Sequence, residues 1–453
     1  MEVSIIGTGY IGLTTGAALA YLGHRVVCHD IDEKKIRRLK EGQTPFYEPW
    51  LEKLMSMVKA RLSFTHHYPE AISKADIVFI SVGTPSLDDG STDLSQLRNA
   101  VWNIGRCLEK KFTVIVTKST VPIGSGNWVE ATLSEVLRSR EDDNVATFSI
   151  AANPEFLREG SALFDTFYPD RIVIGSDDPR ALQLINDLYQ PIGEQSFVAP
   201  DFLPRPENIR TVPILSTSLA SAEIIKYAAN AFLALKISFI NEISQLSEKF
   251  KMDIFEITQG IGLDSRIGGR FLEPGVGWGG SCFGKDTAAL IAAAQEFGIP
   301  VPIVRAARDV NYQQRKRVVE KLVAALSTLK ERTVGLLGLA FKPHTDDVRD
   351  APALEFCRQL TSLGAKVKVH DPVAMPNAEF ALSGLRIEFC ERPEEVAAGA
   401  DALLLVTEWP EYRELPWELI AKQMKAPLIL DGRNYLDRDR MKRAGFNYMG
   451  IGR

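Results

Sequence analysis

The amino-acid sequence predicts an α/β protein in which two Rossmann-like, doubly wound domains are joined by a long central helix and a helical middle domain. Residues 2–30 follow the order strand, glycine-rich turn, helix and strand, and the second strand ends in an aspartate. A strand pattern at 366–371 ends in the same His-Asp pair. Between the two, residues 216–251 carry a helical pattern without proline or glycine.

Length, composition and charge exclude several classes of protein. A chain of 453 residues is too long for one hydrophobic core, and 45% hydrophobic with 25% charged residues is ordinary globular composition. The net charge of −5 argues against nucleic acid or an anionic membrane as the main partner. The strand-like start leaves no room for a signal peptide, and no apolar run approaches the ~20 residues of a membrane span. We therefore expect a cytoplasmic protein.

Cysteines and histidines give no sign of a disulfide framework or a metal site. The five cysteines are scattered, which fits a reducing compartment. The six histidines show no spacing typical of zinc ligands, so no metal is expected.

The first glycine-rich turn, at residues 7–12, predicts a dinucleotide site. Gly7 forms the turn, Gly9 lets the backbone approach a pyrophosphate, and Gly12 allows the helix to pack close to the sheet. The free N–H groups at the start of that helix would bind the anion. Asp30 would accept hydrogen bonds from the ribose hydroxyls and repel a 2′-phosphate, so the sequence favours NAD over NADP.

A helix at 13–22 and strands at 76–82, 112–117 and 146–152 continue the alternation of a parallel sheet. Thr84 and Thr120 follow two of these strands, and ligands of open α/β sheets bind beyond the carboxyl ends of strands. Both threonines should therefore lie at the cofactor. Each hydroxyl could equally cap a helix.

The strand at 146–152 leads into Asn-Pro-Glu-Phe-Leu-Arg-Glu-Gly at 153–160. Glu155 and Glu159 are four residues apart, so a helical turn would point both carboxylates in one direction. Two like charges in this arrangement are mildly unfavourable unless a task requires them. A solvated surface is the alternative explanation.

Residues 195–213 predict a long loop after the first domain, because they contain Pro-Arg-Pro among polar residues. The helix at 216–251 has apolar residues nearly all round it, which predicts burial on several sides, between domains and between subunits. Lys226 and Asn230 interrupt this apolar character at a spacing of four and should point the same way. Alternatively, Lys226 extends to water and Asn230 is an ordinary satisfied polar group.

The segment 277–286 places one thiol, Cys282, among four glycines, and Lys285 and Asp286 follow within a turn. Such a run of glycines costs chain entropy unless tight geometry is needed, so a thiol held there suggests covalent chemistry. A glycine-rich turn with an ordinary buried cysteine is the alternative.

The last part of the chain predicts a second sheet. An apolar segment at 333–342, a helix at 352–363 and strands at 366–371, 402–406 and 427–430 repeat the alternation of the first domain. We expect domain boundaries at 1–200 for the dinucleotide-binding domain, 212–328 for the helical middle domain and 329–453 for the second Rossmann-like domain.

Taken in order, these motifs resemble the UDP-glucose/GDP-mannose dehydrogenase family over nearly the whole chain. The likeness rests on the segments 119–122, 153–160, 279–286, 338–342 and 346–349 and on the Lys226/Asn230 helix. Gly284 departs from the family pattern, in which many members have proline, and the loop at 195–213 is longer than usual. The resemblance implies that a primary alcohol of UDP-glucose is oxidised to the carboxylate of UDP-glucuronate by two NAD in succession.

The resemblance also implies roles for individual side chains. Cys282 would add to the aldehyde formed first, giving a thiohemiacetal and then a thioester that water opens. Lys226 and Asn230 would stabilise negative oxygen in the adducts. Water would be activated by Glu155 and positioned by Thr120 and Asp286, with Glu159 as a supporting carboxylate.

The binding residues implied by the resemblance fall into two groups. Those for NAD are Gly7, Gly9, Tyr10, Ile11, Gly12, Asp30, Lys34, Thr84, Thr120, Lys285 and Arg349. Those for the nucleotide sugar are Glu155, Phe156, Leu157, Lys226, Asn230, Arg266, Phe271, Gly279, Phe341, Lys342 and Arg433. Arg266 would reach the sugar nucleotide across a subunit boundary, which implies a homodimer or a higher homo-oligomer. Taken alone, each basic residue is more often a solvated surface charge.

Three other functions remain open at this point. The same reaction could act on GDP-mannose or another nucleotide sugar, although the Gly-Gly-Ser-Cys-Phe form of the cysteine segment points to the glucose type. A two-electron hydroxyacid dehydrogenase would share the NAD domain and the long helix but have no need of Cys282. A non-catalytic sensor of NAD or sugar nucleotides would not need Cys282, Lys226, Asn230 and Asp286 together.

Overall fold

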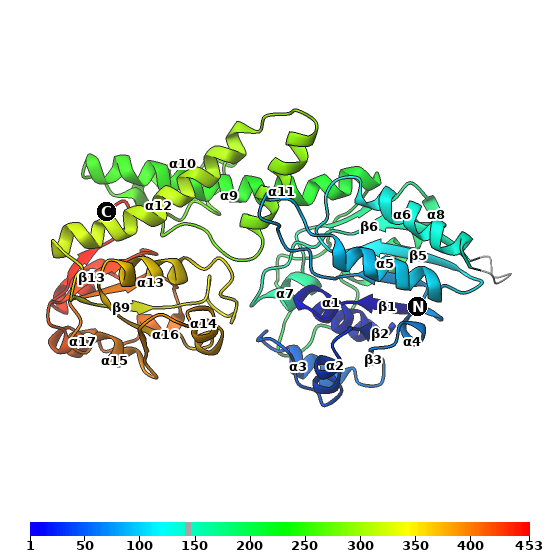
Figure 1. Ribbon diagram of the computed structural model, residues 1–453, viewed down its shortest axis with the longest axis horizontal. Coiled ribbons are helices and arrows are strands. Elements are labelled where there is room, and N and C mark those ends of the chain that lie inside the picture. Colours follow the sequence, from blue (N-terminus) through cyan, green and yellow to red (C-terminus); the bar gives the residue numbers. More distant parts are fainter. Residues whose placement is uncertain (141–145) are drawn as a thin grey trace. The chain divides into compact units, whose positions relative to one another are not determined.

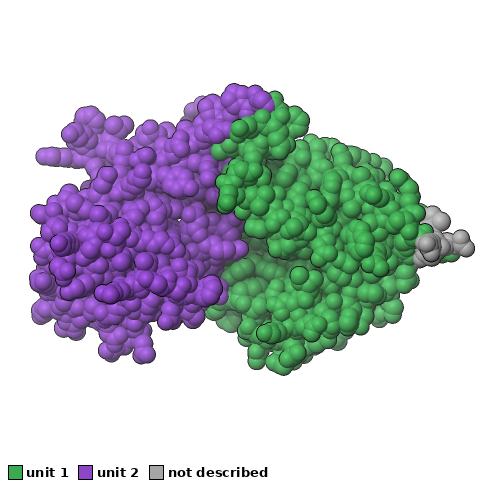
Figure 2. All heavy atoms as spheres, viewed as in Figure 1, with its two compact units in different colours: residues 1–229, 288–297 green, residues 230–287, 298–453 purple. Residues whose placement is uncertain are grey.

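The computed structural model describes residues 1–140 and 146–453 (Figure 1). Contacts divide them into two compact units, drawn in different colours in Figure 2. Unit 1 contains Met1–Ala229 and Ala288–Phe297, and unit 2 contains Asn230–Thr287 and Gly298–Arg453. The domain boundaries at 1–200, 212–328 and 329–453 stay a prediction.

Unit 1 is built on a sheet that has eight strands within the described residues, in the order β3-β2-β1-β4-β5-β6-β7-β8. The strands are β1 (Glu2–Ile6), β2 (Arg25–His29), β3 (Leu62–Thr65), β4 (Ile77–Ile80), β5 (Phe112–Thr117), β6 (Thr147–Ala152), β7 (Ile172–Gly175) and β8 (Ile214–Thr217). The predicted strands at the start of the chain, at 76–82, at 112–117 and at 146–152 are confirmed within a few residues, whereas β3, β7 and β8 were not predicted.

One strand pair departs from the parallel sheet that the sequence predicted. β6 and β7 are antiparallel, whereas β7 and β8 are parallel again. The connection from β6 to β7 contains only the short helix α7 (Ala162–Phe167). Because the chain re-enters the sheet at the edge where β6 ends, β7 must run back in the opposite direction.

Helices cover both faces of this sheet (Figure 1). They are α1 (Tyr10–Tyr21), α2 (Glu33–Lys40), α3 (Leu51–Met57), α4 (Tyr68–Ile72), α5 (Ser95–Cys107), α6 (Ser125–Arg138), α7 and α8 (Pro179–Gly193). In β4, Ile77 and Phe79 belong to one hydrophobic cluster, and Val78 and Ile80 belong to another. Successive side chains of a strand point to opposite faces, so a strand buried on both faces is apolar throughout.

The long helix α9 (Leu219–Lys249) confirms the predicted helix and is slightly shorter at both ends. In the single chain one side of α9 is exposed, so the predicted burial between subunits stays a prediction. Phe232 is 61% exposed, Phe239 47% and Leu246 51%. These positions are separated by seven residues, or about two turns, so they form a continuous apolar stripe.

Unit 2 contains a second doubly wound sheet, with six strands in the order β11-β10-β9-β12-β13-β14 for the part of the chain that is described. The strands are β9 (Thr333–Leu337), β10 (Lys366–His370), β11 (Ile387–Phe389), β12 (Ala402–Leu405), β13 (Leu428–Asp431) and β14 (Asn447–Met449). The order is that of the first six strands of unit 1, 3-2-1-4-5-6, which confirms two Rossmann-like folds.

The remaining helices of the molecule follow α9 in sequence. They are α10 (Ile254–Gly262), α11 (Phe283–Glu296), α12 (Pro302–Leu326), α13 (Pro352–Ser362), α14 (Met375–Ala381), α15 (Pro393–Ala397), α16 (Pro410–Arg413), α17 (Trp417–Gln423) and α18 (Arg438–Arg443). No helix within 1–140 or 146–453 is long and apolar enough to cross a membrane.

Close packing in the second sheet generates a stability prediction. A Cβ at Gly335 in β9 would lie 2.5 Å from a methyl carbon of Val396 and 2.9 Å from its carbonyl oxygen. Gly335→Ala should therefore destabilise unit 2 by about 1–3 kcal/mol, because the backbone must shift to admit the methyl group. Scanning calorimetry measures the change as a lower melting temperature.

Gly260→Ala provides the matched control. A Cβ at Gly260, in α10, would meet no atom within 4 Å, and alanine favours a helix by up to about 1 kcal/mol over glycine. An unchanged melting temperature for Gly335→Ala, or a marked fall for Gly260→Ala, would contradict this account of the packing.

Candidate active site

The turn between β1 and α1 is shaped to receive a phosphate. Gly7 has φ +100°, and a Cβ there would lie 2.5 Å from the Ser81 carbonyl oxygen. A Cβ at Gly12 would lie 1.9 Å from the Gly7 carbonyl oxygen, so both glycines are required by packing. At Gly9, in contrast, a Cβ would meet nothing within 4 Å. Gly9 begins α1 without a side-chain cap, so the N–H groups of the first turn can bind an anion.

Asp30 lies at the end of β2, where the ribose of a dinucleotide is expected. Its Oδ2 accepts hydrogen bonds from the Thr8 N–H at 3.0 Å, the Thr8 hydroxyl at 2.7 Å and Lys35 Nζ at 2.8 Å. Burial alone would raise the pKa of Asp30, but the hydrogen bonds from Lys35 and Thr8 lower it below its ordinary value. Asp30 is therefore ionised at neutral pH, as ribose recognition requires, and these residues fit NAD.

Lys35 is a residue that the sequence prediction did not name; Lys34 was named, and its role at NAD stays a prediction. Asp32 caps α2 and accepts hydrogen bonds from the backbone N–H groups of both lysines. Helical side chains lean toward the N-terminus of their helix, and Lys35 is the one that reaches Asp30. The N-cap aspartate was the available signal, because it places Lys35 in the first turn.

The loops after β4 and β5 are joined at the same edge of the sheet. The Thr84 hydroxyl donates to the Thr120 carbonyl oxygen at 2.9 Å, and the Ser119 hydroxyl donates to that of Val82 at 2.7 Å. A further residue of this edge was missed by the sequence prediction: Glu223 on α9 accepts hydrogen bonds from the N–H groups of Gly124 and Gly126. The structure thus brings Thr84 and Thr120 together beside the glycine turn, and Glu223 anchors the Thr120 loop.

Glu155 and Lys226 form a buried ion pair, with 3.0 Å between Oε1 and Nζ. Glu155 also accepts a hydrogen bond from the Leu157 N–H at 2.6 Å, and Lys226 lies 5.4 Å above the centre of the Phe156 ring. Burial raises the pKa of Glu155, but the charge and hydrogen bond of Lys226 lower it below the ordinary value. Lys226 is buried and does not extend to water.

The predicted helical turn that aligns Glu155 with Glu159 is wrong, because residues 153–158 are irregular. The backbone N–H groups that a helix would use bind carboxylates: Arg158 N–H donates to Asp165 at 2.8 Å, and Gly160 N–H donates to Glu48 at 2.7 Å. Glu155 is buried, whereas Glu159 is half-buried. The two carboxylates therefore have different surroundings.

In unit 2, Cys282 lies at the N-terminus of α11. Its carbonyl oxygen accepts the Asp286 N–H at 2.8 Å, which is the first helical hydrogen bond, and its half-buried Sγ lies 3.7 Å from the Ser281 hydroxyl. The positive end of the helix dipole favours negative charge on a sulfur at this position. Cys282 and Asp286 are four residues apart, on one face of the first turn.

Asp286 connects this turn to α9. The buried carboxylate accepts a hydrogen bond from Asn230 Nδ2 at 2.6 Å and pairs with Lys285 Nζ at 2.7 Å. Unit 2 thus brings together Cys282, Asn230 and Asp286, which the sequence singled out for catalysis. Lys285, which was assigned to the cofactor, lies against Asp286.

Side chains of α12 hold the glycine-rich segment in place. Asn311 Oδ1 accepts the Trp278 N–H at 2.8 Å, and Arg315 donates to the Trp278 carbonyl oxygen at 2.7 Å. Gln314 donates to the Gly275 carbonyl oxygen at 2.8 Å. The sequence prediction missed these three buried residues. Their spacing of three and four, which places polar groups on one helix face, was the available signal.

Residues of the second sheet surround the same segment. Gly280 has φ +85°, and a Cβ there would lie 2.7 Å from the Phe341 ring. Arg433 donates to the Val406 carbonyl oxygen at 2.8 Å and reaches that of Gly277 at 3.5 Å. A Cβ at Gly279 would lie 2.3 Å from the Asp350 carbonyl oxygen. Gly279, Phe341 and Arg433, all predicted to bind the substrate, therefore gather around the cysteine segment, with Lys342 above the Phe341 ring.

Of the other predicted residues, two arginines pair with neighbouring aspartates, and Phe271 lies against Phe283 of the cysteine segment. Arg266 is exposed and pairs with Asp264, Arg349 pairs with Asp347, and the Phe271 ring lies 6.4 Å from that of Phe283. Their assigned roles at a subunit boundary, at NAD and at the sugar stay predictions. Among the described side chains, no group of three or more His, Cys, Asp or Glu could hold a metal ion.

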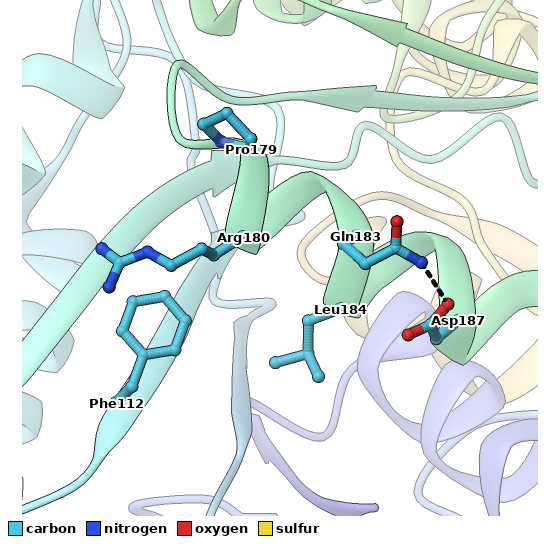
Figure 3. A pocket seen from close by; sticks show the side chains of 6 residues that line it. All are labelled: Phe112, Pro179, Arg180, Gln183, Leu184 and Asp187. Carbon is cyan, nitrogen blue, oxygen red and sulfur yellow. Dashed lines mark hydrogen bonds between the residues drawn. The ribbon is translucent and has the colours of Figure 1, made fainter.

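A surface pocket of about 430 Å³ in unit 1 is separate from these residues. Figure 3 shows the Arg180 guanidinium above the Phe112 ring and the hydrogen bond from Gln183 to Asp187. The guanidinium carbon lies 4.4 Å from the ring centroid. Phe112 begins β5, so the pocket lies at the amino end of that strand. Ligands of such sheets bind at the carboxyl ends of the strands, where Thr120 lies.

Comparisons with known proteins cover the whole chain. Profiles of the UDP-glucose/GDP-mannose dehydrogenase family match residues 1–193 (NAD binding domain), 220–313 (central domain) and 335–438 (UDP binding domain). The chain is 43% identical to UDP-glucose 6-dehydrogenase TuaD of Bacillus subtilis (strain 168), covering 100% of this chain and 93% of that protein. It is also 43% identical to UDP-glucose 6-dehydrogenase of Rhizobium meliloti (strain 1021), with 100% of both chains covered.

A solved structure agrees with these sequences. A UDP-glucose dehydrogenase from the hyperthermophilic archaeon Pyrobaculum islandicum superposes with a TM-score of 0.88 at 37% identity, covering 100% of this chain and 97% of that one.

The buried ion pair generates the prediction for this site. Lys226→Met should destabilise unit 1 by about 3–5 kcal/mol, because it leaves a buried carboxylate without its main partner. Adding Glu155→Gln should recover much of the loss, since the uncompensated charge is removed. Denaturant titration of the two single variants and the double variant gives the coupling energy.

The pH dependence of the free energy of unfolding and a surface ion pair provide the controls for this prediction. Because the folded pKa of Glu155 is lowered, its stabilisation is present above the unfolded value of about 4.3 and is lost as the pH falls through the folded value. Lys111 pairs with Asp76 near the surface, so Lys111→Met should cost less than about 1 kcal/mol. Equal costs for Lys226→Met and Lys111→Met would contradict the account.

Proposed function

Because the chain belongs to the UDP-glucose/GDP-mannose dehydrogenase family, we propose that it oxidises UDP-glucose through a covalent bond to Cys282. The chain is an NAD-dependent oxidoreductase acting on UDP-glucose. The observation that carries the covalent route is the position of Cys282, which lies at a helix N-terminus one turn before Asp286 and its partner Asn230. A nucleophile in such a position needs little further activation.

The proposed route has three chemical stages. Removal of a hydride and a proton converts the C6 alcohol to an aldehyde. The aldehyde has no hydroxyl group, so it cannot give up a second hydride until a nucleophile adds to it. Addition of the Cys282 sulfur gives a thiohemiacetal, and loss of a second hydride and proton gives a thioester. Water then opens the thioester, releasing the carboxylate and regenerating the thiol. NAD, when bound, supplies the hydride acceptor for both oxidations.

The surrounding side chains have separate tasks in this proposal. Asn230, whose amide is oriented by Asp286, donates to the negative oxygen of the adducts, and the Lys226 ammonium stabilises the same charge. Glu155 is ionised and can accept a proton from the water that opens the thioester. Thr120 and Asp286 position that water, and Glu159 supports the carboxylate.

The two ligands are bound by separate groups of residues. Gly7, Gly9 and Gly12 receive the NAD pyrophosphate, with Asp30 and Lys35 at its ribose. Phe341 and Arg433 hold the nucleotide of the sugar beside the cysteine segment. We also infer that the enzyme works in the cytoplasm.

We infer that the enzyme forms a homodimer through α9. The stripe of Phe232, Phe239 and Leu246 is exposed along a helix of 31 residues, about 46 Å long. A second copy of the same helix, related by a two-fold axis, would cover this stripe with an identical apolar surface. A contact of this length, with flanking residues, can bury the area that a stable dimer needs.

The stoichiometry of NADH tests the proposed reaction. Wild-type enzyme should form two NADH for each UDP-glucose, and Cys282→Ser should lower kcat by about 10³ or more, because the nucleophile is lost. Spectrophotometry with limiting UDP-glucose gives the count, and GDP-mannose serves as the competing substrate. Cys107→Ser, on α5, is the matched control and should retain full activity.

Two results would overturn this proposal. One NADH per sugar with a fully active Cys282→Ser would indicate a two-electron dehydrogenase. Tight binding of both ligands without turnover by the wild type would indicate a sensor.

A charge in the apolar stripe tests the dimer. Phe239→Glu should shift the enzyme from dimer to monomer, because two carboxylates would be buried in one interface. Sedimentation velocity measures the change. Phe380→Glu, at a residue 84% exposed on α14, should leave the dimer intact. A monomeric wild type, or a dimeric Phe239→Glu, would refute the α9 interface.

A further inference from the structure

Lys118 is a buried lysine that the reaction described above does not use. It follows β5 directly, and β5 pairs with β6 so that Thr117 lies opposite Ala152. Lys118 and Asn153 therefore leave the sheet side by side, and Lys118 Nζ donates to Asn153 Oδ1 at 3.0 Å. The sequence prediction considered this segment only for Thr120.

Asn153 is held from several directions. Its Oδ1 also accepts the Tyr189 hydroxyl at 2.7 Å, and its Nδ2 donates to the Val173 carbonyl oxygen at 2.8 Å. Its own N–H donates to the Thr117 carbonyl oxygen at 3.0 Å. Asn153 begins the irregular segment that carries Glu155 two residues later. Lys118 thus helps to fix the position from which Glu155 extends.

Lys118 also acts on Glu155 through its charge. Burial lowers the pKa of Lys118 to about 8; the negative charge of Glu155 opposes this shift, and the positive charge of Lys226 adds to it. Lys118 in turn contributes to the lowered pKa of Glu155. One buried carboxylate is therefore accompanied by two buried ammonium groups, only one of which forms the 3.0 Å ion pair.

We propose that Lys118 is a positioning residue for Glu155: its ammonium keeps the Glu155 carboxylate ionised, and its hydrogen bond to Asn153 fixes the segment from which that carboxylate extends. The inference rests on the proposed role of Glu155 in opening the thioester.

Among residues 1–140 and 146–453, groups that contact this cluster come from at least five elements or loops. Lys226 is on α9, Lys118 follows β5, and Tyr189 is on α8. The Phe79 ring of β4 lies 5.9 Å from Lys118 Nζ, and Arg171, before β7, lies 3.5 Å above the Phe156 ring. Lys118 and Lys226 are the cations that lower the pKa of Glu155, so removing one should be measurable.

The pH profile of thioester hydrolysis tests the proposal. Lys118→Met removes the ammonium and keeps the apolar stem beside Phe79. Because the charge of Lys118 contributes to the lowered pKa of Glu155, the acidic limb of the single-turnover hydrolysis rate should move to higher pH. The KM for UDP-glucose should change little, because the Lys118 side chain is buried.

Two further variants separate charge from hydrogen bonding. Lys118→Gln keeps a donor for Asn153 without a charge and should shift the acidic limb as Lys118→Met does; it also serves if Lys118→Met fails to fold. Lys118→Arg keeps the charge and should leave the limb near the wild-type position. Lys110→Met, which removes an exposed lysine shortly before β5, should match the wild type.

The outcomes are distinct. An acidic limb that stays in place in Lys118→Met and Lys118→Gln, while the melting temperature falls, would overturn the proposal and leave Lys118 a purely structural residue. A shift in Lys118→Met alone, with Lys118→Gln like the wild type, would overturn the role of the charge. The NADH count of the wild type tests the reaction itself, so a failure there is recognised separately.

Discussion

The two segments that carry the reacting side chains have an irregular, partly buried backbone, so side chains must pair its buried N–H and C=O groups. An unpaired buried backbone group costs about as much as a lost hydrogen bond. Around Glu155, the side-chain partners are the carboxylates of Asp165 and Glu48. Around Cys282, they are Asn311 and Arg315 on α12. The polar residues that appear structural are therefore the ones that fix the chemistry in place.

The same pairing allows charges to be buried where the proposed reaction needs them. A lone carboxylate in the position of Glu155 would take up a proton, because burial penalises the charged form. With Lys226 at 3.0 Å it stays ionised. Asp286 is similarly buried, and it receives the amide of Asn230 and the ammonium of Lys285. Each carboxylate thus has a fixed orientation, which reduces reorganisation during a reaction.

Sequence patterns predicted the parts of this structure that local physics determines. The Gly7–Asp30 unit, the strands at 112–117 and 366–371 and the long helix follow from glycine spacing and apolar periodicity, and they were found within a few residues. The helical turn at Glu155 failed because distant carboxylates bind its N–H groups. Lys35 was not named, and the polar face of α12 could indicate Arg315 but not its partners Trp278 and Asp350, which are 35 or more positions away. Contacts at such separations leave no local pattern.

The helix α9 shows why a spacing can be predictable when its purpose is not. Lys226 and Asn230 are one turn apart, a rise of about 6 Å, and the sequence alone predicts this spacing. Lys226 binds Glu155 in unit 1, whereas Asn230 binds Asp286 in unit 2. Glu223, one turn before Lys226, anchors the Thr120 loop, and Ser238, two turns beyond Asn230, binds the Trp278 indole. A continuous helix therefore sets the axial positions of four side chains with different partners. Insertion of a single residue would rotate the side chains that follow the insertion by about 100° relative to those that precede it.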